Sequence, residues 1–183
     1  MQISNIDYET LTKMLTGAAN LVIQNRDELT QIDAAIGDGD HGVTMERVMN
    51  IVITKIKESS STNMSALLQN IAWALMDCNG GATGPLYGSL FLGMSDAIAE
   101  KTVLDGISLA CMLEGGMKSI MQQSKAKIGD KTMMDALIPA INAANKAVAD
   151  NKGIIDILKA ASVAASAGSE YTSTISAHFG RAK

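Results

Sequence analysis

Apolar residues recur along the chain at intervals of three and four, which is the spacing of one buried face of an α-helix. We expect a first helix after Ser4, with Asp7 as its capping-box partner and an apolar stripe made by Leu11, Met14, Leu15, Ala18 and Val22. A second helix should begin just after Asp40, and its buried side is marked by Val48, Val52 and Ile56. A third carries Met64, Leu67, Leu68, Ile71 and Leu75 inward.

The second half of the chain continues the pattern. We expect a fourth helix that has Pro85 in its first turn and ends near Glu100, and a fifth that starts near Ile107. Thr132 and Asp135 have capping-box spacing for a sixth helix, which contains Pro139 and is expected to kink or start late there. A seventh, alanine-rich helix is expected from Ile154 to about Phe179.

Composition supports an all-helical reading. Hydrophobic residues make up 47% of the chain but aromatic residues only 3%, whereas strands favour aromatic and β-branched residues. No alternating strand pattern and no internal repeat is present in the sequence. We therefore predict one all-α domain over residues 1–183, built from seven amphipathic helices whose short connections favour antiparallel neighbours.

Charge and targeting signals restrict the partners. The net charge of −4 argues against a nucleic-acid partner held by its phosphates. The first ten residues lack a basic and an apolar region, and no apolar run reaches the length of a membrane span, so we expect a cytoplasmic protein without a membrane partner. Cys78 and Cys111 form no CxxC pair and are predicted to be buried free thiols.

The segment "IGDGDHGVTM" places Asp38 and Asp40 between glycines, shortly after Asp33. Three carboxylates gathered in one place repel one another, and a hard divalent cation bound through oxygen would offset that repulsion. An EF-hand calcium loop does not fit, because the glycine and the glutamate that such a loop needs are absent. The other interpretation is that these acids precede a helix, where negative charge suits the helix dipole. The stretch alone leaves both interpretations open.

A glycine-rich segment, "GGATGPLYG", leads into the proline-started helix. Free N–H groups at a helix start bind phosphate, and Thr83 adds a hydroxyl. The segment is neither a P-loop nor a dinucleotide-binding fingerprint, and alone it reads better as an ordinary helix–helix turn. A cation cluster and an anion-binding loop together suggest a magnesium–phosphate ligand.

Two weaker features stay open. The segment "KAKIGDKTMM" is either a nucleotide-facing turn or a polar connector. Arg181 is either a phosphate partner or a solvated surface residue. His41 is an acid–base group or only a partner for the loop, and His178 is assigned no role.

In combination, "DAAIGDGDHGVTM", "GGATGPLYGSLF", "KAKIGDKTMMDAL" and "STISAHFGRA" resemble, in order and spacing, the DhaL family of ADP-binding subunits of dihydroxyacetone kinases. The resemblance covers nearly the whole chain. It implies a barrel of antiparallel helices with ADP or ATP and Mg²⁺ at one rim. It also implies Mg²⁺ ligands and nucleotide contacts. The metal ligands are Asp33, Asp38 and Asp40, and the nucleotide contacts are His41, Gly42, Val43, Thr44, Gly81, Ala82, Thr83, Ser124, Met133 and Arg181.

The resemblance further implies a reaction and partners. In the family, bound ADP accepts a phosphoryl group from a phosphohistidine on a DhaM-type protein, and the ATP formed phosphorylates dihydroxyacetone held on a DhaK-type subunit. This places the chain in glycerol metabolism, linked to the phosphotransferase system. No catalytic nucleophile is needed on this chain. A homodimer, one or two Mg²⁺ ions and the identity of the hydroxy-ketone are left open by the sequence.

Three other readings compete with this one. The chain could be a non-catalytic, ADP-bound partner of a transcription regulator, the nucleotide domain of another DhaL-type kinase, or a helical interaction module with an incidental cation site. One departure bears on all of them. Related sequences continue after "GRA" with a nucleotide-holding segment and a final helix, whereas this sequence stops at Lys183. We expect that difference to leave one barrel edge open and to weaken the grip on ADP.

Overall fold

The computed structural model describes residues 3–78 and 81–178. Over these residues the chain forms eight α-helices and one 3₁₀ turn, and the only β feature in the same ranges is an isolated bridge between Ile6 and Leu104. The elements are α1 (Tyr8–Gln24), α2 (Arg26–Ala34), α3 (His41–Glu58), α4 (Met64–Met76), α5 (Thr83–Ile98), α6 (Gly106–Gln123), α7 (Met134–Ala149), α8 (Ile154–Tyr171) and η1 (Thr172–Thr174). The predicted all-helical fold is confirmed.

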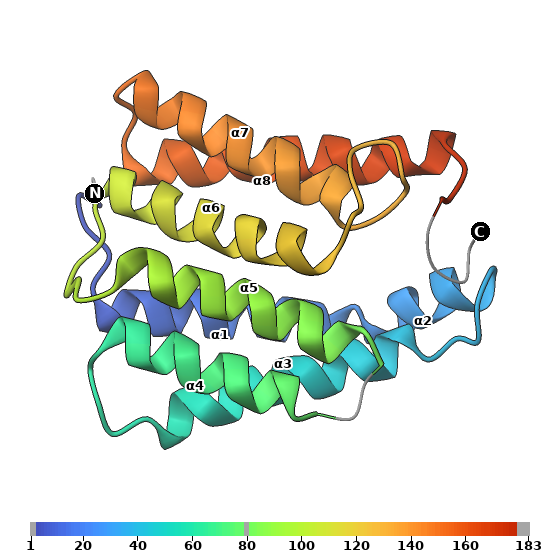
Figure 1. Cartoon of the computed structure of the whole chain (residues 1–183), viewed down its shortest axis with the longest axis horizontal. Coiled ribbons are helices and arrows are strands. Elements are labelled where there is room, and N and C mark those ends of the chain that lie inside the picture. The colour runs from blue at the N-terminus through green and yellow to red at the C-terminus, as the bar shows by residue number, and fades with distance from the viewer. Residues whose placement is uncertain (1–2, 79–80, 179–183) are drawn as a thin grey trace.

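The helices form two layers that run side by side along the long axis of the molecule (Figure 1). Helices α4, α5, α6 and α7 make the front layer, and α1, α3 and α8 lie behind them (Figure 1). From α3 onward each helix packs antiparallel to the next, as the short connections predicted. The starts of α3, α5 and α7 and the ends of α2, α6 and α8 consequently meet at one end of the bundle (Figure 1).

Helix α2 is the element that the apolar pattern did not predict. It extends α1 toward the same end of the bundle and has no buried residue, so it carries no apolar stripe to detect. It packs on α3 through a close backbone approach. A Cβ on Gly42 would overlap the Arg26 carbonyl oxygen and the Thr30 hydroxyl, so only glycine allows the two helices this close. That approach places the end of α2 beside the start of α3.

The ends of the chain differ from expectation in two places. Asp7, not Ser4, caps α1, because its carboxylate accepts from Thr10 N at 2.8 Å while the Ile6–Leu104 bridge keeps the preceding residues extended. Helix α8 ends at Tyr171 rather than near Phe179, a residue outside the described ranges. Three consecutive hydroxyl side chains donate back to carbonyls three residues earlier, which competes with continuation of the helix. These residues are Thr172, Ser173 and Thr174.

The main core lies between the two layers, and its largest fully buried side chains include those predicted on α4. On α1, Ala19 is buried rather than Ala18. A second, smaller core of Ile120, Ala126 and Met134 lies at the α6–α7 end. Pro139 is accommodated inside α7, whose range is continuous from Met134 to Ala149. None of the described helices is long and apolar enough to cross a bilayer.

Both cysteines are free, as predicted, but they are not both buried. Cys78 is partly buried, whereas Cys111 is exposed because it lies outside the buried stripe of α6.

Candidate functional site

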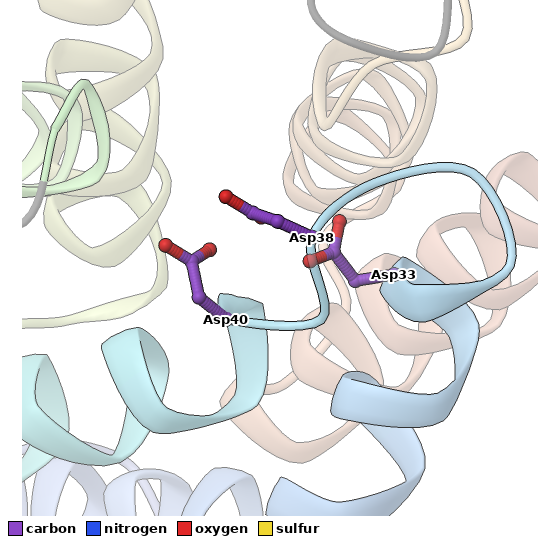
Figure 2. Close-up of side chains that lie close together, drawn as sticks. All are labelled: Asp33, Asp38 and Asp40. Atoms are coloured by element: carbon purple, nitrogen blue, oxygen red, sulfur yellow. The ribbon is translucent and has the colours of Figure 1, made fainter.

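The three aspartates that the sequence singled out come together in the structure. Each offers a carboxylate oxygen, and the three oxygens lie within 4.8 Å of one another. Figure 2 shows Asp33 at the end of α2, Asp38 on the connecting loop and Asp40 just before α3, with the carboxylates of Asp38 and Asp40 reaching toward the same space. Asp33 is half-buried and the other two are exposed. The gathering on which the cation hypothesis depends is therefore present.

Local backbone geometry produces this arrangement. Gly39, between Asp38 and Asp40, has a φ of +72°, a left-handed conformation that favours glycine. It turns the chain back toward α3. Asp33 closes α2, and its carbonyl oxygen accepts from Ile36 N at 3.0 Å. The loop is thus a tight reversal that returns Asp40 to the neighbourhood of Asp33.

The first helix turn of α3 contributes to the same place. Asp33 Oδ2 accepts from His41 N at 3.3 Å, so this carboxylate faces the start of α3 across the loop. This contact is the helix-start role that was the alternative interpretation of the acidic stretch, and it involves one of the three carboxylates. Asp40, which precedes α3 directly, makes no side-chain cap hydrogen bond.

The donor set fits a hard divalent cation. The ligand atoms are carboxylate oxygens only, at least two of them exposed, which leaves room for waters and for phosphate oxygens. No histidine or cysteine side chain belongs to the cluster as found among the described residues, so the set does not have the nitrogen or sulfur ligands typical of zinc. The residues present therefore suit Mg²⁺.

The residues after the cluster separate into two kinds. His41 and Val43 are exposed and Thr44 is partly buried, so these three can face a ligand at the rim. Gly42 is buried against α2, so its demonstrated role is packing.

The glycine-rich segment forms the start of α5. Helix α5 begins at Thr83 and has Pro85 in its first turn, which confirms the predicted placement. Gly81 has a φ of +59°, and it and Ala82 are exposed immediately before the helix. Gly84 is buried against α4, where an added Cβ would lie 2.6 Å from the Leu75 carbonyl oxygen. The start of α5 therefore presents backbone N–H groups at the same end of the bundle as the aspartates (Figure 1).

The segment between α6 and α7 carries the two remaining described residues of the predicted set. Ser124 follows α6 and Met133 precedes α7, and both are partly buried. One half of the predicted capping box is present, since Thr132 N donates to Asp135 Oδ2 at 2.8 Å. The Thr132 hydroxyl accepts from Met134 N at 3.2 Å rather than from Asp135 N, and Met133 is the residue directly before the helix. Arg181 lies outside the described residues.

One acidic residue in this segment had no predicted role and proves to organise it. Asp130 is almost fully buried and accepts from Lys127 N at 2.8 Å and pairs with His178 Nδ1 at 3.0 Å. The Lys127 N–H group, and after it His178, hold the pKa of the Asp130 carboxyl below its usual range. No sequence signal pointed to this pair, because 48 residues separate its members.

Taken together, the described residues define a helical bundle with a carboxylate cluster suited to a cation and a helix that follows a glycine-rich segment at one end. A family model described as the DAK2 domain matches residues 35–183, and the chain therefore belongs to the DAK2 domain family.

Individual relatives agree with this assignment. The ADP-binding subunit DhaL of the PEP-dependent dihydroxyacetone kinase of Escherichia coli is 30% identical over 172 residues, covering 94% of this chain and 82% of the relative. The ADP-binding subunit DhaL of the PTS-dependent enzyme of Lactococcus lactis is 34% identical over 137 residues, covering 75% of this chain and 69% of the relative. These relatives are subunits of dihydroxyacetone kinases, as the resemblance implied.

A solved structure supports the fold. The dihydroxyacetone kinase from C. freundii, in complex with AMP-PNP and Mg²⁺, superposes with a TM-score of 0.66 at 26% identity, over 90% of this chain. The match spans 29% of that larger chain.

Proposed function

We propose that the chain is the ADP- and Mg²⁺-binding phosphoryl-transfer subunit of a dihydroxyacetone kinase. The observation that carries the proposal is the convergence of the Asp33, Asp38 and Asp40 carboxylates within 4.8 Å at the end of the bundle where α5 begins. A cation site beside a free helix start suits a diphosphate, because the cation and the N–H groups attract the same oxygens. Family membership and the nucleotide named for its relatives point the same way.

Each part of the site has a task in this proposal. Asp33, Asp38 and Asp40 hold Mg²⁺, which when bound supplies positive charge to the phosphate oxygens. The N–H groups at the start of α5, with Gly81, Ala82 and the Thr83 hydroxyl, orient the phosphates. Phosphoryl transfer depends on alignment and charge neutralisation more than on a protein nucleophile, so these residues suffice without a covalent intermediate on the chain. His41, Val43 and Thr44 border the phosphates, and Ser124 and Met133 border the nucleoside.

The remaining parts of the proposal concern partners. The phosphoryl group comes from a phosphohistidine on a DhaM-type protein, and dihydroxyacetone is held on a DhaK-type subunit that docks at the same rim. Location in the cytoplasm follows from these partners. The gathered site favours this reading over a helical module with an incidental cation, because it combines a cation cluster with an anion-binding helix start.

The first experiment measures Mg-ADP binding by calorimetry for the unaltered protein, Asp38→Asn and Asp40→Asn. We expect each substitution to weaken binding by at least about tenfold, roughly 1.4 kcal/mol, while circular dichroism shows intact helices. Asp96→Asn is the matched control. It makes the same charge change on an exposed part of α5, about 20 Å along the helix from Thr83. Unchanged affinity in both site variants would overturn the metal assignment.

A second experiment separates catalyst from sensor. One portion of the purified protein is heated and its supernatant is analysed for released ADP, and a second, unheated portion is incubated with a phosphorylated DhaM-type protein. Transfer of the phosphoryl group to bound ADP supports the kinase role. Bound ADP without transfer would favour the ligand-sensing partner of a regulator instead.

A further inference from the structure

The segment between α6 and α7, residues 124–133, is an ordered loop with two residues in left-handed backbone conformations. Lys131 has a φ of +59°, a left-handed conformation that side-chain-bearing residues seldom adopt, and Gly129 has a φ of +94°. Such conformations persist only where surrounding contacts fix them. Asp135, buried in α7, supplies two of these contacts by accepting from Gly129 N at 2.6 Å and Thr132 N at 2.8 Å.

The other fixing contacts come from the far end of the described chain. His178 N donates to the Asp130 carbonyl oxygen at 3.1 Å, and His178 Nδ1 lies 3.0 Å from Asp130 Oδ1. Lys131 Nζ donates to the Ile175 carbonyl oxygen at 3.2 Å. Three contacts thus fasten residues 175–178 to the two residues at the tip of the loop.

The burial of the two side chains indicates the role of the contact between Asp130 and His178. The Asp130 side chain is 6% exposed, whereas that of His178 is 63% exposed. Removing the imidazole leaves no cavity, so His178 does not serve the core. It does leave the Asp130 Oδ1 without this partner, while Oδ2 keeps the Lys127 N–H. The contact therefore acts on the loop rather than on the bundle.

The small core of Ile120, Ala126 and Met134 supports the loop, so the loop tip can change while the helices stay in place. Ala126 of the loop belongs to the small core with Ile120 and Met134, and Met133 and Leu137 pack against that core. This core ties the two ends of the loop to α6 and α7, while the tip depends on the aspartate contacts. Loss of His178 is thus expected to alter the loop tip and to leave the helices in place.

Building on the proposed function, we propose that the Asp130–His178 contact is a positioning contact that holds loop 124–133 in the conformation that receives the nucleoside of ADP. Ser124 and Met133 stand at the two ends of this loop. When only a fraction of molecules has the competent loop, the apparent dissociation constant rises by the inverse of that fraction. His178 acts through the loop and needs no contact with the ligand.

The test compares two ligands that share the cation and phosphate part of the site, Mg-ADP and Mg-pyrophosphate, by calorimetry. His178→Ala should weaken Mg-ADP about three- to tenfold and change Mg-pyrophosphate less than twofold. His178→Asn should restore Mg-ADP affinity to within twofold, because the asparagine Nδ2 can replace the imidazole Nδ1 as donor. Ser173→Ala is the matched control, since it removes a side-chain hydrogen bond in the preceding turn η1, from Ser173 to the Glu170 carbonyl oxygen, that does not reach the loop.

The outcomes separate the two proposals. If the unaltered protein does not bind Mg-ADP, the proposed function fails and the inference fails with it. If the unaltered protein binds but His178→Ala binds equally well, only the positioning role is overturned. Equal losses for ADP and pyrophosphate, or no rescue by asparagine at an unchanged melting temperature, also overturn it.

Discussion

Gly42, the second residue of α3, lies directly against the Arg26 carbonyl oxygen of α2. The contact links packing to the candidate metal site, because α2 ends at Ala34 and carries Asp33 in its last turn. Arg26 also pairs with Glu46 of α3 at 3.3 Å, so the two helices are joined at the side chain as well as at the backbone. The position of the Asp33 carboxylate therefore depends on the absence of a methyl group at Gly42, which lies nine residues later in the chain on the neighbouring helix.

Gly42→Ala tests this dependence. The added methyl group would overlap the Arg26 carbonyl oxygen and the Thr30 hydroxyl, so α2 must shift and carry Asp33 away from Asp38 and Asp40. We expect a loss of about 1–3 kcal/mol in the free energy of unfolding and at least a fivefold weaker Mg-ADP affinity. Chemical denaturation and calorimetry measure the two effects.

Gly17→Ala is the control for that substitution. Gly17 lies inside α1 and an added Cβ would meet nothing within 4 Å, so alanine should raise stability by up to about 1 kcal/mol. Equal behaviour of the two variants would contradict the close-approach argument.

Thr83→Val probes the phosphate side of the site. Valine keeps the branched shape but removes the hydroxyl at the first residue of α5. We expect Mg-ADP affinity to fall about two- to tenfold, a milder effect than that of the aspartate variants, with little change in melting temperature. Thr83→Ser, which keeps the hydroxyl, should bind within twofold of the unaltered protein. A serine variant as weak as the valine variant would contradict a hydroxyl contact.

Gly115→Ala tests the packing of the front layer. Gly115 of α6 faces Gly93 of α5, and an added Cβ would lie 2.5 Å from the Gly93 carbonyl oxygen and 2.6 Å from the Ala97 Cβ. The helices must separate, so we expect a loss of about 1–3 kcal/mol, seen as a lower midpoint in chemical denaturation. A midpoint as high as that of Gly17→Ala would show that this interface can absorb a methyl group.

Asp105 gives a pH-dependent prediction. Its carboxylate caps α6 by accepting from Ser108 N at 2.8 Å, and this backbone N–H group holds the pKa of Asp105 below its usual value. Because the unfolded chain takes up the proton first, the stabilisation is complete at neutral pH and is lost as the pH falls below about 4 through the lowered native pKa.

Asp105→Ala should therefore cost about 1 kcal/mol at pH 7 and much less in acid. Asp105→Asn, which keeps an acceptor, should cost less at pH 7. Denaturation midpoints of the three proteins at pH 7 and pH 3 provide the comparison, and a cost for alanine that is the same at both pH values would rule out a charged cap.

The sequence predicted those parts of the fold that carry an apolar stripe or a turn signal. Helix α4 is an example, because the side chains predicted to point inward are all buried. Helix α2 escaped prediction because its apolar pattern is short: Leu29 packs against the core, Ile32 is exposed, and the closest contact with α3 is backbone against Gly42. Helix α8 ends before its alanine-rich composition predicts, because three hydroxyl side chains donate back to carbonyl oxygens of its last turn.

The candidate site shows the same division. Three aspartates close in sequence and separated by glycines could be expected to converge, and they do. The Asp130–His178 contact could not be expected, since it exists only after α7 and α8 have folded back along each other. Clusters of residues close in sequence can be predicted from their spacing, whereas contacts between distant segments depend on how the helices pack.

The small core of Ile120, Ala126 and Met134 affects which substitutions the protein can accept during evolution. It supports the α6–α7 loop separately from the side chains that hold the two layers together. Substitutions there can reshape the loop while the bundle retains most of its cooperative stability. Hydrogen exchange should reveal this as two tiers of protection, with amides of residues 124–133 opening far more often than those around Leu68. Under the proposed function, a bundle arranged in this way can acquire a preference for a different base without first losing its fold.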